Sequence, residues 1–332
     1  MAPATLARPA LSATPRGEPM NYHWARIGER GTLLGMTLMV AIQRRLGRWP
    51  FRLALWPVML WYFLVHTTAR RASQAFLQRL YPSLKQQPFA RWWQSYRHFL
   101  AFGETLMDKV EAWSGNIADE RLMGSGVERF TQAIAGGQGG LILVAHHGNL
   151  DVVNALTERH TNLDLTVMMH TRNARKFNAL LERVTGKPRP QILEVSEVTP
   201  ATAQTLAERI NAGGYVVIAA DRLPLSGERT QPLDFLGDRA SFPEGPFRLA
   251  TLLRCPLYTL ACVRDDDNFR IDFELLGDTQ SLPRRQRETW IADTMQAHAD
   301  HLSERVRRHP LQWFNFYPFW INDTGYLHDD TA

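Results

Sequence analysis

The sequence predicts an α/β fold: a mostly parallel central sheet with an antiparallel portion, flanked by helices and preceded by an N-terminal helical region at a membrane surface. Short apolar runs alternate with helical patterns after the Gly-rich stretch at residues 136–140, as in the βα units of parallel sheets. Before that stretch, two apolar segments flank a basic linker. We therefore expect a leader at residues 1–21, a helical region at 22–135 and an α/β core at 136–325, the last two forming one structural unit.

Length and composition allow a large hydrophobic core. Of the 332 residues, 45% are hydrophobic, and the two cysteines are Cys255 and Cys262. Two cysteines make neither a disulfide framework nor a CxxC pair, so we expect both to pack in the core of a protein in a reducing, cytoplasmic compartment. The 38 Lys and Arg against 33 Asp and Glu give a net charge of +5, which suits an acidic partner such as an anionic membrane surface. No nucleic-acid-binding motif accompanies this charge, so we predict no nucleic-acid partner.

The first 65 residues carry the membrane prediction. Residues 1–21 contain four prolines and no hydrophobic period, and we interpret them as a disordered leader. The apolar stretches at 32–43 and 53–65 are each shorter than the roughly 18 residues that cross a bilayer. The linker at 44–52 carries four arginines, and tryptophans flank the apolar runs, which is typical of a monotopic helical hairpin whose cations meet lipid phosphates. A pair of core helices with a solvated basic turn, or a full transmembrane span, are the alternatives.

The rest of the chain follows the pattern of a helical region and then βα units. Residues 70–135 are expected to be mostly helical. Strands are predicted at 141–145, 165–169, 191–195, 215–220, 257–263 and 269–276, and helices from 149, at 174–184, at 200–212, from 243 and at 284–308. The polar residues 265–268 predict a hairpin turn between the last two strands. Ligands on such sheets gather at the carboxyl ends of the strands, so the site is expected at that edge.

His146 directly follows the first strand, and four residues separate it from Asp151. Asn149 suits the N-cap of the next helix, and a turn at Gly148 would close the gap between the two side chains. A carboxylate that holds one tautomer of an imidazole leaves the other ring nitrogen able to take a proton. We therefore predict that His146 is a general base oriented by Asp151, with His147 pointing the other way. A packed core histidine, a metal site that includes His147, and an aspartate that only favours the helix dipole are the alternatives.

Asp221 and Arg222 occupy a comparable position after a later strand. The strand predicted at 215–220 ends immediately before them, at another carboxyl end. A guanidinium there can clamp a phosphate or a carboxylate. The alternative is an ordinary structural ion pair.

A third segment, Phe242-Pro243-Glu244-Gly245, lies where a helix is expected to begin. Pro243 suits the first position of a helix, and Glu244 would lie in its first turn. Gly245 permits the close approach of a ligand or of a neighbouring backbone. Taken alone, this segment predicts only a helix start.

Together these segments resemble the lysophospholipid acyltransferase superfamily. Its members share a His-x4-Asp (or Glu) block, an Arg-bearing block after a later strand, a Phe-Pro-Glu-Gly block and a further apolar strand with proline, here at residues 255–258. All four blocks occur here in the family's order, and the resemblance extends over residues 22–320. Pro246 stands where many phospholipid-making members have Thr or Ser, which argues against a glycerol-3-phosphate acceptor. The chain is most similar to the bacterial branch related to the lipid A late acyltransferases, through residues 28–31, 221–247 and 312–317.

The resemblance implies an acyltransferase. His146 would take the proton of an acceptor hydroxyl or amine, which attacks an acyl thioester, while Asp151 orients the imidazole. The donor would be an acyl carrier protein or coenzyme A as co-substrate, with no metal or other cofactor, and the acceptor a lipid or glycolipid. The expected location is the cytoplasmic face of the bacterial inner membrane, with peripheral or monotopic attachment. Substrate binding is expected of Arg222, Glu244, Gly245, Asn149 and Gly148, the last two also offering backbone N–H groups to the oxyanion.

Two other functions compete with this reading. A metal-dependent hydrolase would use His146, His147 and Asp151 as ligands and would need further ligands in a metal motif, to which neither His160 nor His170 belongs. A non-catalytic membrane- or carrier-binding protein would need only the basic N-terminal region. The aromatic tail is expected to pack in the core or to line an acyl-chain groove or membrane contact; its members are Trp313, Phe314, Phe316, Tyr317, Phe319 and Trp320.

Overall fold

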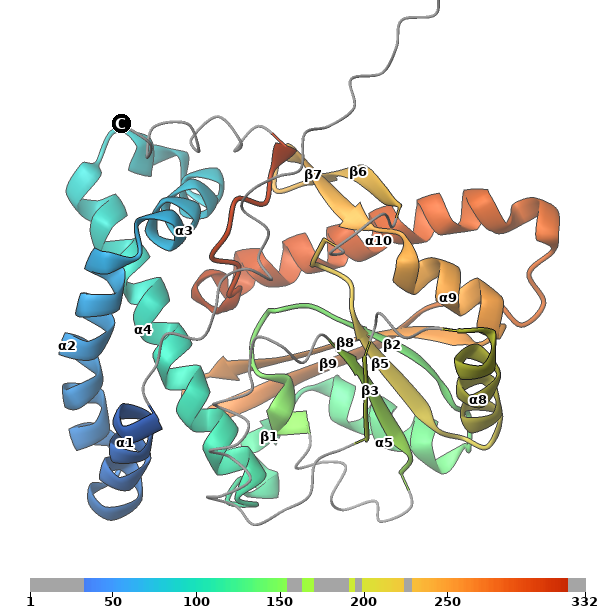
Figure 1. The fold of residues 1–332 in the computed structure, drawn as a ribbon, viewed down its shortest axis with the longest axis horizontal. Helices are drawn as coiled ribbons and strands as arrows, with labels where there is room; N and C mark the ends of the chain where they lie inside the picture. Colours follow the sequence, from blue (N-terminus) through green and yellow to red (C-terminus); the bar gives the residue numbers. More distant parts are fainter. Residues whose placement is uncertain (1–32, 154–162, 170–190, 195–198, 224–228, 322–332) are drawn as a thin grey trace, which may run out of the picture.

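The computed structural model in Figure 1 describes residues 33–153, 163–169, 191–194, 199–223 and 229–321. The leader predicted at residues 1–21 and the helix predicted at 174–184 lie outside the described residues.

Seven of the strands form one sheet in the order β1-β9-β8-β2-β5-β3-β4, and β6 and β7 form a separate hairpin. The strands are β1 (Leu122–Met123), β2 (Gly140–Val144), β3 (Leu165–Met169), β4 (Gln191–Glu194), β5 (Tyr215–Ala219), β6 (Thr230–Phe235), β7 (Asp238–Pro243), β8 (Pro256–Asp265) and β9 (Asn268–Asp278). From β8 to β4 all neighbours run parallel, whereas β9 is antiparallel to β8 and parallel to β1. The predicted fold class, a mostly parallel sheet with an antiparallel portion, is confirmed.

Helices surround this sheet and extend to one side of it (Figure 1). They are α1 (Leu33–Leu46), α2 (Arg48–Val65), α3 (Thr67–Leu80), α4 (Pro88–Trp113), α5 (Ser125–Ala135), α8 (Pro200–Asn211), α9 (Gly245–Leu253) and α10 (Arg287–Arg308). Short 3₁₀ turns lie between or after these helices and strands: η2 (Pro82–Lys85), η3 (Asp119–Arg121), η4 (Leu150–Val152), η7 (Arg284–Gln286) and η8 (Pro310–Gln312).

The alternation of side chains along β2 divides the core into two layers. Leu141 and Leu143 lie in one hydrophobic cluster with buried residues of α8, α9 and α10. Ile142 and Val144 lie in a second cluster with the buried side of α5 and the end of α4. Because both faces of a parallel sheet must be covered, its central strands are apolar at consecutive positions, which is the pattern that the sequence shows.

The N-terminal helices pack around a third cluster. Phe51, Leu55, Met59 and Phe63 recur every four residues along α2 and are all buried in the cluster that α2 forms with α1 and α4. The opposite side of α2 is exposed although it is apolar. In the part of the chain that the structure describes, no helix is long and apolar enough to cross a membrane.

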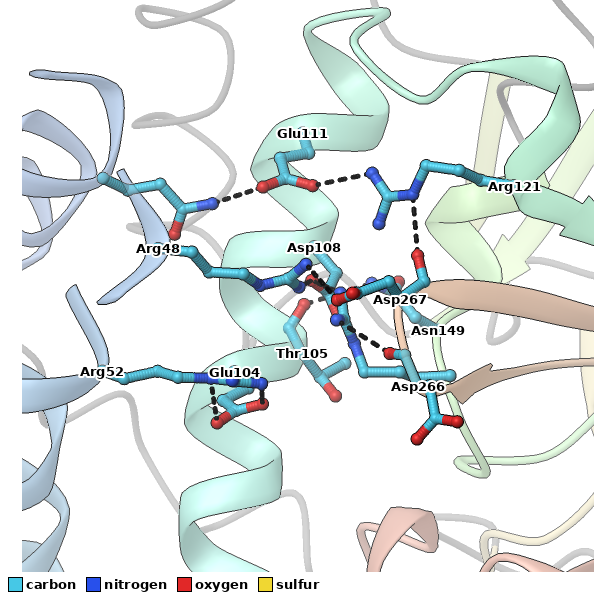
Figure 2. Close-up of polar contacts among 12 residues, drawn as sticks. Arg48, Arg52, Glu104, Thr105, Asp108, Glu111, Arg121, Asn149, Asp266 and Asp267 are labelled. Carbon is cyan, nitrogen blue, oxygen red and sulfur yellow. Dashed lines mark hydrogen bonds and ion pairs between the residues drawn. The ribbon is translucent and has the colours of Figure 1, made fainter. Parts of the chain in front are cut away.

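A polar cluster centred on the buried carboxylate of Asp108 joins α2, α4 and the β8–β9 turn, as Figure 2 shows. The Asp108 carboxylate of α4 is almost completely buried and forms ion pairs with Arg48, at 2.8 Å, and with Arg264. Arg48 also lies 3.8 Å from Asp267 in the β8–β9 turn. A charge as deeply buried as Asp108 needs such partners, so the cluster ties the N-terminal helices firmly to the sheet domain.

Several local predictions differ from the structure. The basic linker is not an extended turn, because Gly47 alone, with a φ of 84°, separates α1 from α2 and the arginines lie within helices. No strand was predicted where the β6–β7 hairpin lies, and Pro243 ends β7 instead of starting a helix. Strand β1 pairs with β9 and α5 packs on β9, so the sheet includes residues before the boundary expected at 136.

Candidate active site

His146 and Asp221 meet at the carboxyl ends of two neighbouring parallel strands. Strands β2 and β5 are paired in register up to Val144 and Ala219, and each of the two polar residues follows its strand by two positions. Consequently the Asp221 carboxylate lies 2.8 Å from His146 Nδ1 through Oδ1. Its second oxygen, Oδ2, accepts the backbone N–H of His146, also at 2.8 Å. This is the edge of the sheet at which the sequence predicted the site.

The environment of this pair suits a neutral imidazole beside an ionised carboxylate. Asp221 is completely buried. Burial alone would raise its pKa, but His146 and Arg222 outweigh burial and hold the pKa of Asp221 well below its ordinary value. Desolvation by the surrounding protein and the charge of Arg222 lower the pKa of His146, and Asp221 partly opposes them. An ionised Asp221 can only accept, so the His146 proton is on Nδ1 and Nε2 keeps a lone pair.

Arg222 borders the same imidazole. Its Nε lies 3.2 Å from His146 Nδ1, its Nη2 donates to the backbone oxygen of Phe314 at 3.2 Å, and its guanidinium carbon is 5.0 Å from the centre of the Tyr317 ring. The single proton on Nδ1 is donated to Asp221, so Nδ1 has no lone pair left to accept a hydrogen bond from Arg222. The 3.2 Å contact is therefore an electrostatic interaction and not a hydrogen bond. The structure thus places Arg222 beside His146, and its binding of a substrate group stays a prediction.

Asp151 does not contact His146 in the way that the sequence predicted. Its carboxylate accepts from Trp113 Nε1 at 2.7 Å and pairs with Lys109 Nζ at 2.8 Å, both on α4. Among the described residues, no hydrogen bond or ion pair joins Asp151 to His146. The reason is the path of the chain, because the positive φ of Gly148 and the 3₁₀ turn η4 carry Asp151 toward α4.

The backbone N–H groups of Gly148 and Asn149 already have acceptors. Gly148 N donates to Gln312 O at 2.8 Å, and Asn149 N donates to Cys262 O at 2.7 Å. Neither group is available to an oxyanion in this structure, contrary to the expectation from the sequence. Gly148 is required sterically, since a Cβ at this position would lie 1.9 Å from Cys262 O. The Asn149 side chain caps η4 and also donates to Thr105 O of α4 at 3.1 Å (Figure 2).

His147 occupies the opposite side of the chain from His146. Only 1% of it is exposed, against 40% of the His146 side chain. Desolvation lowers the pKa of His147 to about 3, and its Nε2 lies 3.2 Å from His309 O. It is therefore a neutral, interior residue, and the exposed imidazole of the two is that of His146.

Glu244 and Gly245 start α9, as a capping residue and the first helical residue. The Glu244 carboxylate accepts from Arg248 Nε at 2.7 Å, and Arg248 also pairs with Glu288. Within the described ranges, no hydrogen bond or ion pair connects Glu244 with His146, Asp221 or Arg222. The structure thus holds Glu244 in a fixed orientation without placing it in the His146 group.

The aromatic tail, residues 313–320, contacts both His146 and Asp221 through hydrogen bonds. Trp313 is completely buried, and its Nε1 donates to Asp221 Oδ2 at 3.1 Å. Phe314 N donates to His146 O at 2.8 Å, and Tyr317 Oη donates to Asp221 O at 3.3 Å. The sequence predicted core packing, an acyl-chain groove or a membrane contact for these aromatics, but not their hydrogen bonds with His146 and Asp221. Buried Trp and Tyr need hydrogen-bond partners, and this rule was the one signal available in the sequence.

Both cysteines are buried and free, which agrees with their predicted core packing. No three His, Cys, Asp or Glu side chains gather in a metal-holding arrangement within the residues that the structure describes.

Comparisons with known proteins show the family. The sequence model of the bacterial lipid A biosynthesis acyltransferases matches residues 59–321. A phosphatidylinositol mannoside acyltransferase of Mycolicibacterium smegmatis is 24% identical over 246 residues, which cover 71% of this chain and 70% of that protein. A phosphatidylinositol mannoside acyltransferase of Mycobacterium tuberculosis is 24% identical over 209 residues, 61% of each chain. Since the family match covers most of the chain and includes the His146 group, this protein belongs to the bacterial lipid A biosynthesis acyltransferase family and is an acyltransferase.

Proposed function

We propose that this acyltransferase moves a fatty-acyl group from a thioester donor, an acyl carrier protein or coenzyme A, to a hydroxyl or amine of a lipid or glycolipid, with His146 as general base. The observation that carries the proposal is the contact of His146 Nδ1 with the buried carboxylate of Asp221 at 2.8 Å. This contact leaves Nε2, the other ring nitrogen, as the proton acceptor on a side chain that is 40% exposed.

The chemistry needs no covalent enzyme intermediate. The acceptor oxygen or nitrogen attacks the thioester carbonyl carbon while its proton passes to His146 Nε2. The tetrahedral intermediate then collapses, the C–S bond breaks, and the proton on Nε2 neutralises the departing thiolate. Asp221 stabilises the imidazolium between these two steps. Base catalysis of this kind contributes roughly 10²–10⁴ in rate, so turnover should depend strongly on His146.

Other residues have supporting roles in this proposal. Arg222, beside the imidazole, would bind a phosphate or carboxylate of the acceptor, and Glu244 with Gly245 would contact its hydroxyls. Asp151, Asn149 and Gly148 would shape the loop that carries His146, since their hydrogen bonds fix it to α4 and β8. The names of the mycobacterial relatives, which act on a mannose-bearing lipid, favour a glycolipid acceptor.

We further propose that the protein works at the cytoplasmic face of the bacterial inner membrane, as a peripheral or monotopic protein. Residues 31–103 contain nine arginines, one lysine and no Asp or Glu. On the exposed side of α2, Trp49 is 81% and Leu53 77% exposed, and Phe89 at the start of α4 is 81% exposed. Exposed apolar and aromatic side chains within a stretch of chain whose charged residues are all basic suit the interface of an anionic bilayer.

The activity is tested by acyl transfer from radiolabelled acyl carrier protein and acyl-CoA into a total bacterial lipid extract. We expect the wild type to label a lipid and His146→Ala to lose at least about 99% of the rate. His301→Ala is the matched control, because His301 is also about 38% exposed and faces a carboxylate, Glu274, at 3.4 Å. A wild type that consumes neither donor, or a fully active His146→Ala, would refute the proposal.

The membrane contact is tested by sedimentation with vesicles that contain an anionic phospholipid. Leu53→Asp should bind these vesicles at least about tenfold more weakly, since burying a leucine contributes about 1.5–3 kcal/mol and the new charge is repelled. Leu275→Asp on β9 is the control, because Leu275 is 60% exposed but lies outside the cationic N-terminal region. Equal vesicle binding by the two variants would show that the exposed side of α2 is not the membrane-binding surface.

A further inference from the structure

We propose that Trp313 is a positioning residue for catalysis, whose indole N–H fixes the Asp221 carboxylate against His146. This inference rests on the proposed role of His146. Trp313 Nε1 donates to Asp221 Oδ2 at 3.1 Å, while Asp221 Oδ1 faces His146 Nδ1 at 2.8 Å. Trp313 and Asp221 are both completely buried, so no solvent competes for this hydrogen bond.

The indole determines which oxygen of Asp221 can accept the imidazole proton. Oδ2 receives two N–H groups that can only donate, from Trp313 Nε1 and from the His146 backbone. A proton on Oδ2 would face these two donors, so Oδ2 stays unprotonated and Oδ1 is left for His146. Without the indole, Oδ2 would have one donor instead of two, and a buried carboxylate with fewer donors is less stable and rotates more freely.

The position of Trp313 is itself fixed by contacts on several sides. Its ring packs at 5.0–5.2 Å from the rings of Phe76, Phe235 and Phe319. Its backbone oxygen lies 2.9 Å from His98 Nε2 of α4. Since the next residue also donates its backbone N–H to His146 O, the tail holds both members of the pair at once. Rigid support of this kind is what a catalytic hydrogen bond requires.

Packing alone could also explain a buried tryptophan, and Trp320 provides the control that separates the two explanations. Trp320 lies in the same aromatic cluster, with its ring 5.8 Å from that of Trp313, and it is also buried. Its Nε1 donates at 3.1 Å to the backbone oxygen of Phe235 and not to Asp221. Trp313→Phe and Trp320→Phe therefore remove the same ring atoms and one indole N–H each, from one cluster.

The experiment compares kcat, KM and the pH profile of acyl transfer for the wild type and these two variants. Trp313→Phe should lower kcat at least about tenfold, at the lower end of what a hydrogen bond to a charged group provides, with KM changed less than about twofold. The acid limb of its pH profile should move to higher pH, because an Asp221 with fewer donors attracts the imidazolium proton more strongly. Trp320→Phe should keep the wild-type kcat and pH profile even if its melting temperature falls.

The inference is overturned if Trp313→Phe matches Trp320→Phe in kcat, or if its kcat falls without an upward shift of the acid limb. This failure is distinct from a failure of the proposed function. A wild type without acyl transfer, or an active His146→Ala, would refute the proposed function itself. An active wild type with a dead His146→Ala and a normal Trp313→Phe would refute only the role of Trp313.

Discussion

Replacing Asp221 by asparagine should stop catalysis while leaving the shape of the site intact. In the wild type the carboxylate accepts three N–H groups: His146 Nδ1 and the His146 backbone, both at 2.8 Å, and Trp313 Nε1 at 3.1 Å. An amide of the same size offers one acceptor oxygen and one donor NH₂ group. It therefore cannot satisfy all three donors.

Both orientations of the amide harm the base. If the amide oxygen faces the two N–H groups now on Oδ2, its NH₂ faces Nδ1 and forces the proton of His146 onto Nε2, where the base should be free. If the oxygen faces Nδ1 instead, the NH₂ meets two buried donors with no acceptor, at a cost of about 1–3 kcal/mol per orphaned group. In either case the imidazolium loses its compensating charge, so kcat should fall by about 10²–10⁴.

The assay is the initial rate of acyl transfer at saturating donor and acceptor, with thermal unfolding measured in parallel. Asp151→Asn is the matched control, because the Asp151 carboxylate contacts Trp113 and Lys109 and not His146. We expect Asp151→Asn to keep kcat within about tenfold of the wild type. A folded Asp221→Asn variant that keeps the wild-type kcat would refute the reasoning. If Asp151→Asn were inactive in the same assay, the pairing of His146 with Asp151 that the sequence predicted would be favoured instead.

Three further predictions concern pH and stability. Only neutral His146 can accept a proton, and desolvation together with the charge of Arg222 lowers the pKa of this residue. The value of kcat/KM should therefore rise with pH along an acid limb centred below about pH 6.5. An acid limb centred above pH 7 in the pH–rate profile would contradict this prediction. Asp108→Asn should destabilise the protein by about 3 kcal/mol in denaturant unfolding, since it leaves Arg48 and Arg264 without their buried partner, whereas Asp234→Asn, at an exposed pair with Arg239, should cost under about 1 kcal/mol. Desolvation and Arg305 lower the pKa of buried His298 to about 4, so between about pH 6.5 and pH 4 the unfolded chain binds more protons than the folded protein and the free energy of unfolding falls as pH falls. His298→Leu should reduce this slope by up to about 1.4 kcal/mol per pH unit. Equal slopes for the variant and the wild type would contradict this prediction.

The strands that carry the site were predictable from local patterns. Residues 140–144 and 215–219 are apolar at every position, and glycines precede both runs, which indicates buried strands. A polar residue just beyond the carboxyl end of such a strand is a candidate for the site, and this rule singled out His146, Asp221 and Arg222. The hairpin of β6 and β7 was missed because Pro232 and the charged residues around it resemble a loop.

The sequence by itself determined the fold class, the edge of the sheet where the chemistry lies, and the histidine that performs it in our proposal. Spacing along the chain assigned Asp151, five residues away, as the carboxylate for that histidine, and Asp221 was predicted only as a neighbour of Arg222 at another strand end. Only the tertiary structure decided for Asp221, because the pairing of β2 with β5 brings together side chains that are 75 residues apart. The same long-range packing places the Trp313 indole on Asp221 and engages the N–H groups of Gly148 and Asn149. Such contacts depend on which strands and segments become neighbours, and no local pattern of residues specifies that order.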